Sequence, residues 1–224
     1  MLMASVSITA HHPVQVASRL CRDFREVLAL PEKPAIIAVD MPIGLLAQPS
    51  PGGRVCDRDA RKLLRRPRAS SVFSPPTRAG PAALSYDDVA GLNGAGVSQQ
   101  AFHILPKIRD VDQAITPPHQ RYVVEGHPEL AFMNLAGSPM RHNKKTLEGR
   151  GERMCLLRRT FGNSFRDPPS VRWEHAATKV ALDDVVDAYV LANLAHRILR
   201  GVGNRMPEGR PPEDSRGLRM EIWY

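Results

Sequence analysis

Short apolar runs alternate along the chain with longer amphipathic segments. Residues 35–41 form a run that is apolar on both faces and carries Asp40 at its C-terminal end, and residues 122–125 form a similar run that ends at Glu125. Bounded runs of this length predict buried strands of a mostly parallel sheet. Residues 218–224 predict a further strand at the C-terminus.

Apolar spacings of three and four residues predict helices between these runs. The predicted helices span residues 19–30, 57–64, 98–114, 128–135, 144–160 and 180–199. Strands that alternate with helices imply a three-layer α/β fold. Residues 65–96 are rich in Pro, Gly, Ser and Arg, and they predict a flexible, flap-like insertion over a site.

Length and composition indicate one soluble domain. The 224 residues supply a single core, and 42% hydrophobic with 24% charged residues are typical of globular proteins. No run approaches the roughly 18 apolar residues of a membrane span, and the start MLMASVSITAHHP lacks the basic region of a signal peptide. Three cysteines without a Cys-x-x-Cys pair indicate reduced thiols, so we expect a cytoplasmic protein without a membrane partner.

The chain is basic, with a formal charge of +8 and a pI near 9.9. This balance favours a polyanionic partner such as nucleic acid. An arginine-rich composition would produce the same charge balance on a surface that binds no partner, so both interpretations stay open. A homo-oligomer is compatible with the sequence, which carries no signal for its size.

Four acids stand in otherwise apolar elements. Asp40 and Glu125 lie at C-terminal strand ends, the edge where α/β sheets place ligands. Asp184 and Asp187 are three residues apart on one face of an apolar helix. A buried carboxylate needs a partner, and carboxylate oxygens are ligands that suit magnesium or manganese. In a protein site, such an ion can activate a water for the hydrolysis of a phosphodiester. We therefore expect all four acids to be catalytic, and Asp40, Asp184 and Asp187 to be metal ligands.

Each of these acids also has a structural interpretation. Asp184 lies at a predicted helix start, where acids cap amide groups and favour the helix dipole. Asp40 is positioned to hold the Pro-Ile-Gly turn that follows it. Glu125 and Glu129 flank His127, and the three can form a local hydrogen-bond network.

Basic and hydroxyl residues near the predicted site loops are candidates for phosphate contacts. For each of them, a solvated surface residue is the alternative. No Gly-x-Gly-x-x-Gly or Walker-type loop occurs, so the sequence does not support a nucleotide cofactor. The candidate substrate-binding residues are Arg54, Arg61, Ser70, Ser71, Lys107, His127 and Lys144.

Eight segments together resemble the domain-of-unknown-function family 429, in order from about residue 34 to residue 224. They read AVDMPIGL, RVCDRDAR, SSVFSPP, SQQAFHILPKIRDVD, EGHPELAF, KKTLEGRGER, DDVVDAYVLANLAHR and GLRMEIWY. Members of this family are described as predicted nucleases with a ribonuclease H-like fold. The resemblance thus implies a mixed central sheet flanked by helices, with nuclease activity as the family expectation.

The resemblance also implies roles for the acids. Asp40 looks like the fourth-strand acid of that fold, Asp184 with Asp187 looks like the acidic pair of the last helix, and Glu125 looks like an added ligand or proton-transfer group. Family members open with a strand that carries Asp-Gly, followed by Gly-Trp, whereas this chain begins MLMASVSITAHHPVQVAS. We therefore expect residues 1–33 to be divergent or truncated, with residues 5–10 as a candidate strand.

Three functional hypotheses follow. The first is a divalent-metal-dependent nuclease that hydrolyses nucleic-acid phosphodiester bonds. The second is a catalytically impaired nucleic-acid or partner-binding module of the same fold, which the missing Asp-Gly strand favours. The third is a metal-assisted phosphotransferase or phosphatase that acts on a small molecule, since related folds host that chemistry.

Overall fold

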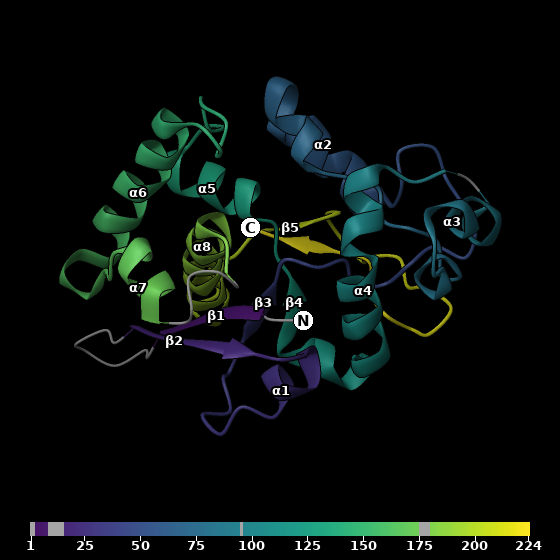
Figure 1. The fold of residues 1–224 in the computed structure, drawn as a ribbon, viewed down its shortest axis with the longest axis horizontal. Helices are drawn as coiled ribbons and strands as arrows, with labels where there is room; N and C mark the ends of the chain where they lie inside the picture. The colour runs from purple at the N-terminus through teal and green to yellow at the C-terminus, as the bar shows by residue number, and fades with distance from the viewer. Residues whose placement is uncertain (1–2, 9–15, 95, 175–179) are drawn as a thin grey trace. The chain divides into compact units, whose positions relative to one another are not determined.

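The chain divides into two compact units, each of which draws on separate parts of the sequence (Figure 1). The computed structural model describes residues 3–8, 16–94, 96–174 and 180–224. Unit 1 comprises residues 1–38, 126–203 and 224, and unit 2 comprises residues 39–125 and 204–223. Both units are discontinuous in sequence, and the single domain expected from length stays a prediction.

Helix α8 (Leu182–Leu199) is the centre of unit 1 and is contacted by α5, α6, α7 and β1 (Figure 1). Its inward face buries Val186, Tyr189 and Val190, and the Tyr189 ring lies edge-on to Phe161 with centroids 5.3 Å apart. Apolar residues on one helix face explain why this segment is central. The other elements of unit 1 are β1 (Met3–Ile8), β2 (Val16–Cys21), α1 (Phe24–Leu28), α5 (Pro128–Ala136), α6 (Leu147–Phe161), η4 (Gly162–Ser164) and α7 (Pro168–Glu174).

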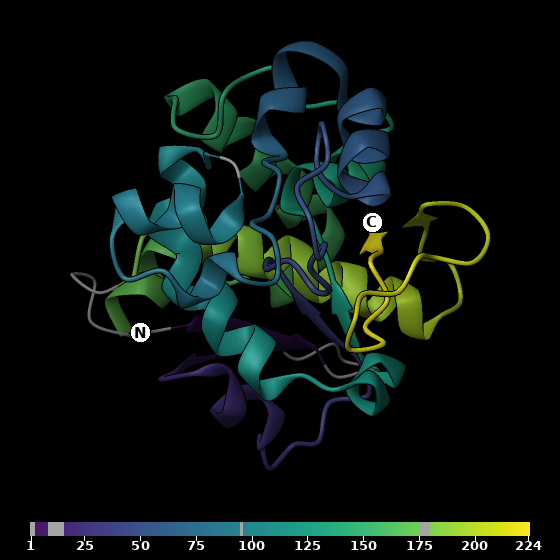
Figure 2. The same ribbon diagram turned by 90° about the vertical axis from the view of Figure 1, so that its right-hand side faces the viewer.

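Unit 2 combines helices with short strands from both ends of its sequence (Figure 2). The C-terminal strands β5 (Arg205–Met206) and β6 (Ile222–Trp223) contact α2 (Val55–Arg68). An apolar cluster that includes Leu45, Leu105 and Ile108 forms part of its core. Its remaining elements are β3 (Ile37–Val39, which begins in unit 1), η1 (Ala69–Ser71), η2 (Gly80–Ala82), α3 (Tyr86–Asn93), α4 (Gln99–Ala114), η3 (Pro117–Arg121) and β4 (Val123–Glu125).

The described strands pair in three two-stranded sheets. Strands β1 and β2 are antiparallel, with Met3 opposite Cys21 and Ile8 opposite Val16. Strand β3 is the neighbour of β4, and β5 pairs antiparallel with β6. The mixture of helices and strands shows the α/β class. The single mixed sheet that the resemblance implies is not seen in the described ranges.

The N-terminal region differs from its prediction. Residues 19–21, predicted as the start of a helix, belong to β2, and the helix is confined to α1. Asp23 is the reason, because its side chain accepts a hydrogen bond from the amide of Glu26 at 2.9 Å and caps α1 there. The candidate strand at residues 5–10 corresponds to β1, and residues 9 and 10 lie outside the described residues.

The predicted flap contains regular structure and buried contacts. Helix α2 is interrupted by a kink at Arg65 and Arg66 and ends at Arg68, and η1, η2 and α3 follow before residue 94. The amide of Thr77 donates to Oδ1 of Asn93 at 2.5 Å, and both residues are buried. This segment therefore contributes to the interior of unit 2.

The other helix predictions are confirmed with small shifts at their ends. Residues 98–114 form α4 after the cap Ser98, and residues 128–135 lie within α5. The helix predicted from residue 144 begins at Leu147, since the Thr146 hydroxyl accepts from the Gly149 amide. In the described ranges, no helix combines the length and apolarity that crossing a membrane requires.

Candidate functional site

The turn after β3 follows directly on Asp40 and is buried. Asp40 itself is exposed, whereas residues 42–45 are buried. Gly44 has φ +77°, and a Cβ at this position would meet Cγ of Met220 at 2.7 Å and the carbonyl oxygen of Leu218 at 3.1 Å. Only glycine suits both this backbone conformation and this close approach. The turn is thus packed against the C-terminal segment of unit 2.

Arg54 holds this turn from the N-terminus of α2. Its Nη1 donates to the carbonyl oxygens of Ile43 and Gly44 at 3.0 and 3.3 Å. Nη1 and Nη2 also donate to the two carboxylate oxygens of Glu125 at 2.7 and 2.6 Å, while Nε and Nη2 donate to Asp57. Glu125 completes the arrangement by accepting from the amide of Ile43 at 2.7 Å. We call these three charged residues, Arg54, Asp57 and Glu125, the Arg54 cluster.

The Arg54 cluster is removed from water. Arg54, Asp57 and Glu125 are 2%, 1% and 7% exposed. Burial raises the pKa of Glu125 to about 7, although the charge and hydrogen bonds of Arg54 lower it. Burial disfavours the charged form of Arg54, yet the neighbouring carboxylates hold its pKa well above the usual value. Burial is the largest cause of the raised pKa of Glu125, and the nearby carboxylate of Asp57 raises it further because both acids share one guanidinium.

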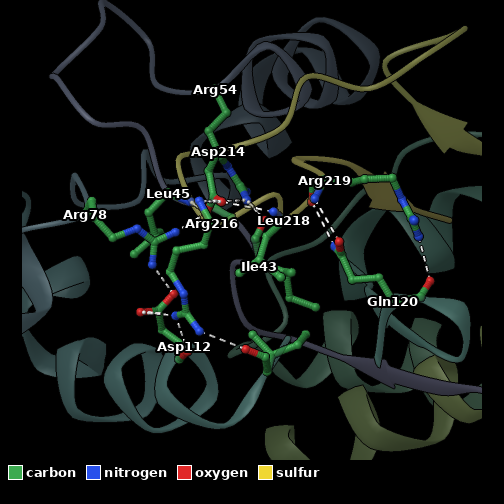
Figure 3. A network of polar contacts seen from close by, with 12 residues as sticks. Ile43, Leu45, Arg54, Arg78, Asp112, Gln120, Asp214, Arg216, Leu218 and Arg219 are labelled. Carbon is green, nitrogen blue, oxygen red and sulfur yellow. Dashed lines mark hydrogen bonds and ion pairs between the residues drawn. The ribbon is translucent and has the colours of Figure 1, made fainter. Parts of the chain in front are cut away.

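A second ionic cluster holds the other side of the turn (Figure 3). Oδ2 of Asp214 accepts from the amide of Leu45 at 3.0 Å, and Arg78 bridges Asp214 and Asp112. Arg216 also pairs with Asp112, at 3.1 Å. These residues were not predicted from the sequence, because they lie in loops and on α4, where charged residues are ordinary. The sequence signal for this cluster was the Asp-Ser-Arg-Gly run from Asp214, a pattern typical of a turn.

The acids of α8 divide between solvent and interior. Asp184 is exposed, and Asp187 is buried on the inward face. Nζ of Lys144 donates to Oδ2 of Asp187 at 2.7 Å, with the Lys144 side chain 37% and the Asp187 side chain 9% exposed. The N-cap residue is Ala181, so Asp184 interacts with the helix dipole in the first turn without forming a side-chain cap.

A buried arginine holds the segment that presents Lys144. Arg153 of α6 is 1% exposed, and its Nη2 donates to Oε1 of Glu129 at 2.5 Å. Its Nη1 donates to the carbonyl oxygens of His142 and Gly149 at 3.2 and 2.8 Å. A Cβ at Gly149 would lie 1.9 Å from the carbonyl oxygen of Asn143, so only glycine permits this packing. The position of Lys144 is therefore fixed by its neighbours in unit 1.

The predicted phosphate contacts occupy varied environments. Arg54 is buried and committed to its cluster, and Arg61 donates to the carbonyl oxygens of Val72 and Gly52. The hydroxyls of Ser70 and Ser71 donate to backbone carbonyls of Pro67 and Arg68. Half-buried positions are taken by Lys107 on α4, His127 at the N-cap of α5, and Lys144.

The predicted acids have different neighbours. Asp40 and Glu125 belong to unit 2, while Asp184 and Asp187 belong to unit 1. Among the described residues, no three acidic, histidine or cysteine side chains lie together as a metal-binding group. Magnesium commonly uses one or two carboxylates, with water and substrate phosphates in its other positions. Asp184 and Asp187 lie one turn apart on α8, the first exposed and the second buried.

The comparisons with known proteins identify the family. No match to the chain was found among curated proteins or among solved structures. One family model, described as "Protein of unknown function (DUF429)", matches residues 4–212. This match spans both units, from the start of β1 to the segment before β6. The chain therefore belongs to the domain-of-unknown-function family 429.

Proposed function

We propose that the chain is a divalent-metal-dependent nuclease of the ribonuclease H-like type, with Asp187 and Asp184 as metal ligands. One observation carries the proposal: the buried carboxylate of Asp187 is paired with the ammonium of Lys144, which is partly open to solvent. A carboxylate on an apolar helix face requires a cation, and a partly exposed ammonium is exchangeable for a metal ion. The family resemblance supports the same assignment.

The residues divide the work as follows. Magnesium or manganese, when bound, supplies an activated water and stabilises the leaving oxygen of a phosphodiester. Asp187 and Asp184 offer carboxylate oxygens, and Lys144 neutralises Asp187 when no metal ion is present. Asp40, exposed at the end of β3, stays the predicted catalytic carboxylate of unit 2. Arg54 and Glu125 act as positioning residues, because they hold the turn that follows Asp40.

The test is isothermal titration with magnesium and with manganese, followed by nuclease assays of the same samples. Asp187→Asn is expected to lose metal binding and cleavage. Lys144→Met removes the competing ammonium, so we expect metal binding to tighten by about tenfold, equivalent to about 1.4 kcal/mol. Asp183→Asn, a half-buried neighbour on α8, is the matched control and should behave as the unmodified chain. Unchanged cleavage by Asp187→Asn contradicts the site assignment.

Asp40 needs a separate measurement. Asp40→Asn is expected to abolish cleavage, and titration of the same variant shows whether metal binding depends on this carboxylate. The exposure of Asp40 makes a folding defect improbable as the cause of lost activity. Full cleavage by Asp40→Asn would remove this residue from the proposed machinery.

A second candidate function is a nucleic-acid-binding module without catalysis. It is favoured by the exposed arginines Arg65 and Arg66 in a basic segment of unit 2. A salt-dependent gel shift in magnesium, with intact nucleic acid recovered afterwards, would select this candidate over the nuclease.

A further inference from the structure

The C-terminal end of α2 carries a concentration of basic side chains. Lys62, Arg65 and Arg66 are exposed, and Arg68 is partly exposed. Cys56, Ala60 and Leu64 face the interior of unit 2 on the other side of the helix. We call the four basic residues Lys62, Arg65, Arg66 and Arg68 the Arg65 turn.

The acids of α2 neutralise this turn only in part, through Lys62. Asp57 is buried in the Arg54 cluster, and Asp59 pairs with Lys62 at 3.1 Å. Among the described residues, no carboxylate forms an ion pair with Arg65 or Arg66. The turn therefore presents net positive charge to solvent.

Arg65 has a backbone conformation that disfavours a side chain. Its φ is 56° and its ψ is 174°, and Arg66 continues in an extended conformation. Glycine adopts this combination without steric conflict, whereas other residues are strained. In the described residues, Lys33 is the other non-glycine residue with a positive φ. An arginine thus stands at a position whose backbone conformation suits glycine, and its side chain is exposed.

We propose that the Arg65 turn binds the phosphodiester backbone of nucleic acid. This inference rests on the proposed function for the class of partner, and it adds the surface that holds it. Guanidinium groups form two parallel hydrogen bonds to a phosphate, and three of the four basic residues are arginines. An anionic membrane is less suited, because binding to lipid needs apolar anchors, and Leu63 at 38% is the one large apolar side chain exposed near the turn.

Fluorescence anisotropy of labelled single-stranded and double-stranded DNA tests this surface. EDTA is present, so that binding is measured without cleavage. Arg65→Gln/Arg66→Gln is expected to weaken binding about tenfold and to reduce the slope of log K against log salt by about 2. Arg150→Gln/Arg159→Gln removes the same charge from exposed positions of α6 and is expected to leave both quantities near their original values.

Arg65→Gly separates recognition from folding. Glycine suits the observed backbone, so we expect an unchanged or higher midpoint of thermal unfolding together with weaker DNA binding. The proposal would be overturned if the double variants of α2 and α6 lost DNA affinity equally. It would also be overturned if both α2 variants kept full DNA affinity. If the α2 variants lost binding to vesicles of anionic lipid but kept their affinity for DNA, the proposal would be overturned in favour of a membrane-binding surface.

The nuclease and the surface fail in different ways. A chain that binds DNA through the Arg65 turn but leaves it intact in magnesium disproves the proposed nuclease and retains the surface. Cleavage by Arg65→Gln/Arg66→Gln at the original rate, with original affinity, disproves the surface and retains the nuclease. A chain that binds no DNA in EDTA overturns the surface.

Discussion

Glu125 in unit 2 and Asp187 in unit 1 arise from the same sequence pattern, an acid in an apolar element, yet their environments differ. Glu125 accepts three hydrogen bonds, two from a guanidinium that is 2% exposed and one from a backbone amide. Asp187 is paired with an ammonium that is 37% exposed. For Glu125 and Asp187 the pattern marks a buried charge, whereas Asp40 and Asp184, which share the pattern, are exposed. We expect the accessibility of the cation to decide whether a buried carboxylate is structural or exchangeable.

The energetic reason lies in the number of groups that each cation serves. Arg54 satisfies two carboxylates and two carbonyl oxygens at once, so its removal leaves several buried polar atoms unpaired. Lys144 donates to Asp187 from a partly solvated position, so we expect water to compensate part of the loss when this pair is broken. Four changes to the chain test this difference, from the largest expected effect to the smallest.

Arg54→Ala should produce the largest effect. It leaves Glu125 and Asp57 buried without their cation, which typically destabilises a protein by about 3–5 kcal/mol. Urea unfolding measures the change. Arg54→Lys retains the charge but loses the forked geometry, and it should fall between the alanine variant and the unmodified chain. A loss below about 1 kcal/mol would mean that the cluster is not structural.

Asp187→Asn should affect activity more than stability. We expect cleavage to fall by at least about 100-fold, equivalent to about 2.7 kcal/mol. Because Lys144 regains water when its partner is neutral, the free energy of unfolding should change by less than half of the Arg54→Ala effect. A destabilisation equal to that of Arg54→Ala would erase the distinction between the two sites.

The pH dependence of stability should carry the signature of Glu125. Its pKa is raised from 4.5 to about 7 by burial, so between these values the folded chain holds a proton that the unfolded chain has released. Stability is therefore highest below the lower value and falls as pH rises towards the upper one, by at most roughly 1.4 kcal/mol per pH unit. Urea unfolding across this window should show the slope, and Glu125→Gln should remove it. A slope retained in Glu125→Gln would assign the titration elsewhere.

Lys62→Ala should have the smallest effect. Its pair with Asp59 lies on the surface, with the lysine side chain 77% exposed, and such pairs contribute about 0–1 kcal/mol. Thermal unfolding should shift only slightly, and added salt should remove the shift. A loss comparable to the Arg54→Ala loss would show that solvent exposure does not rank the ion pairs of this chain.

Local features of the fold were predictable because local chemistry determines them. The helix α8 follows from its apolar face, and α4 from the same spacing after Ser98. Strand β2 was missed because its pairing with β1 is a contact between separate segments, which a helical spacing at residues 19–21 does not reveal. The buried contacts of residues 65–94 were missed for the same reason, since the Thr77–Asn93 bond spans 16 residues.

The candidate site was predictable only in part. The sequence indicated which acids are unusual, and Asp187 is indeed buried on α8. It did not indicate their cations, because Arg54 and Glu125 are 71 residues apart and Lys144 and Asp187 are 43 apart. Arg54 was predicted as a phosphate contact because an arginine in a glycine-rich loop gives no sign of burial in the sequence. The catalytic and ligand roles of Asp40, Asp184 and Asp187 stay predictions.

The hydrogen bond from Leu45 to Asp214 has a consequence for the synthesis of the chain. The two residues are 169 positions apart, so the turn behind Asp40 gains this contact only after residue 214 has been synthesised. Until that point a nascent chain lacks the carboxylate that accepts from the Leu45 amide. Premature termination before residue 214 would leave the turn open, and such products would be substrates for chaperones and proteases.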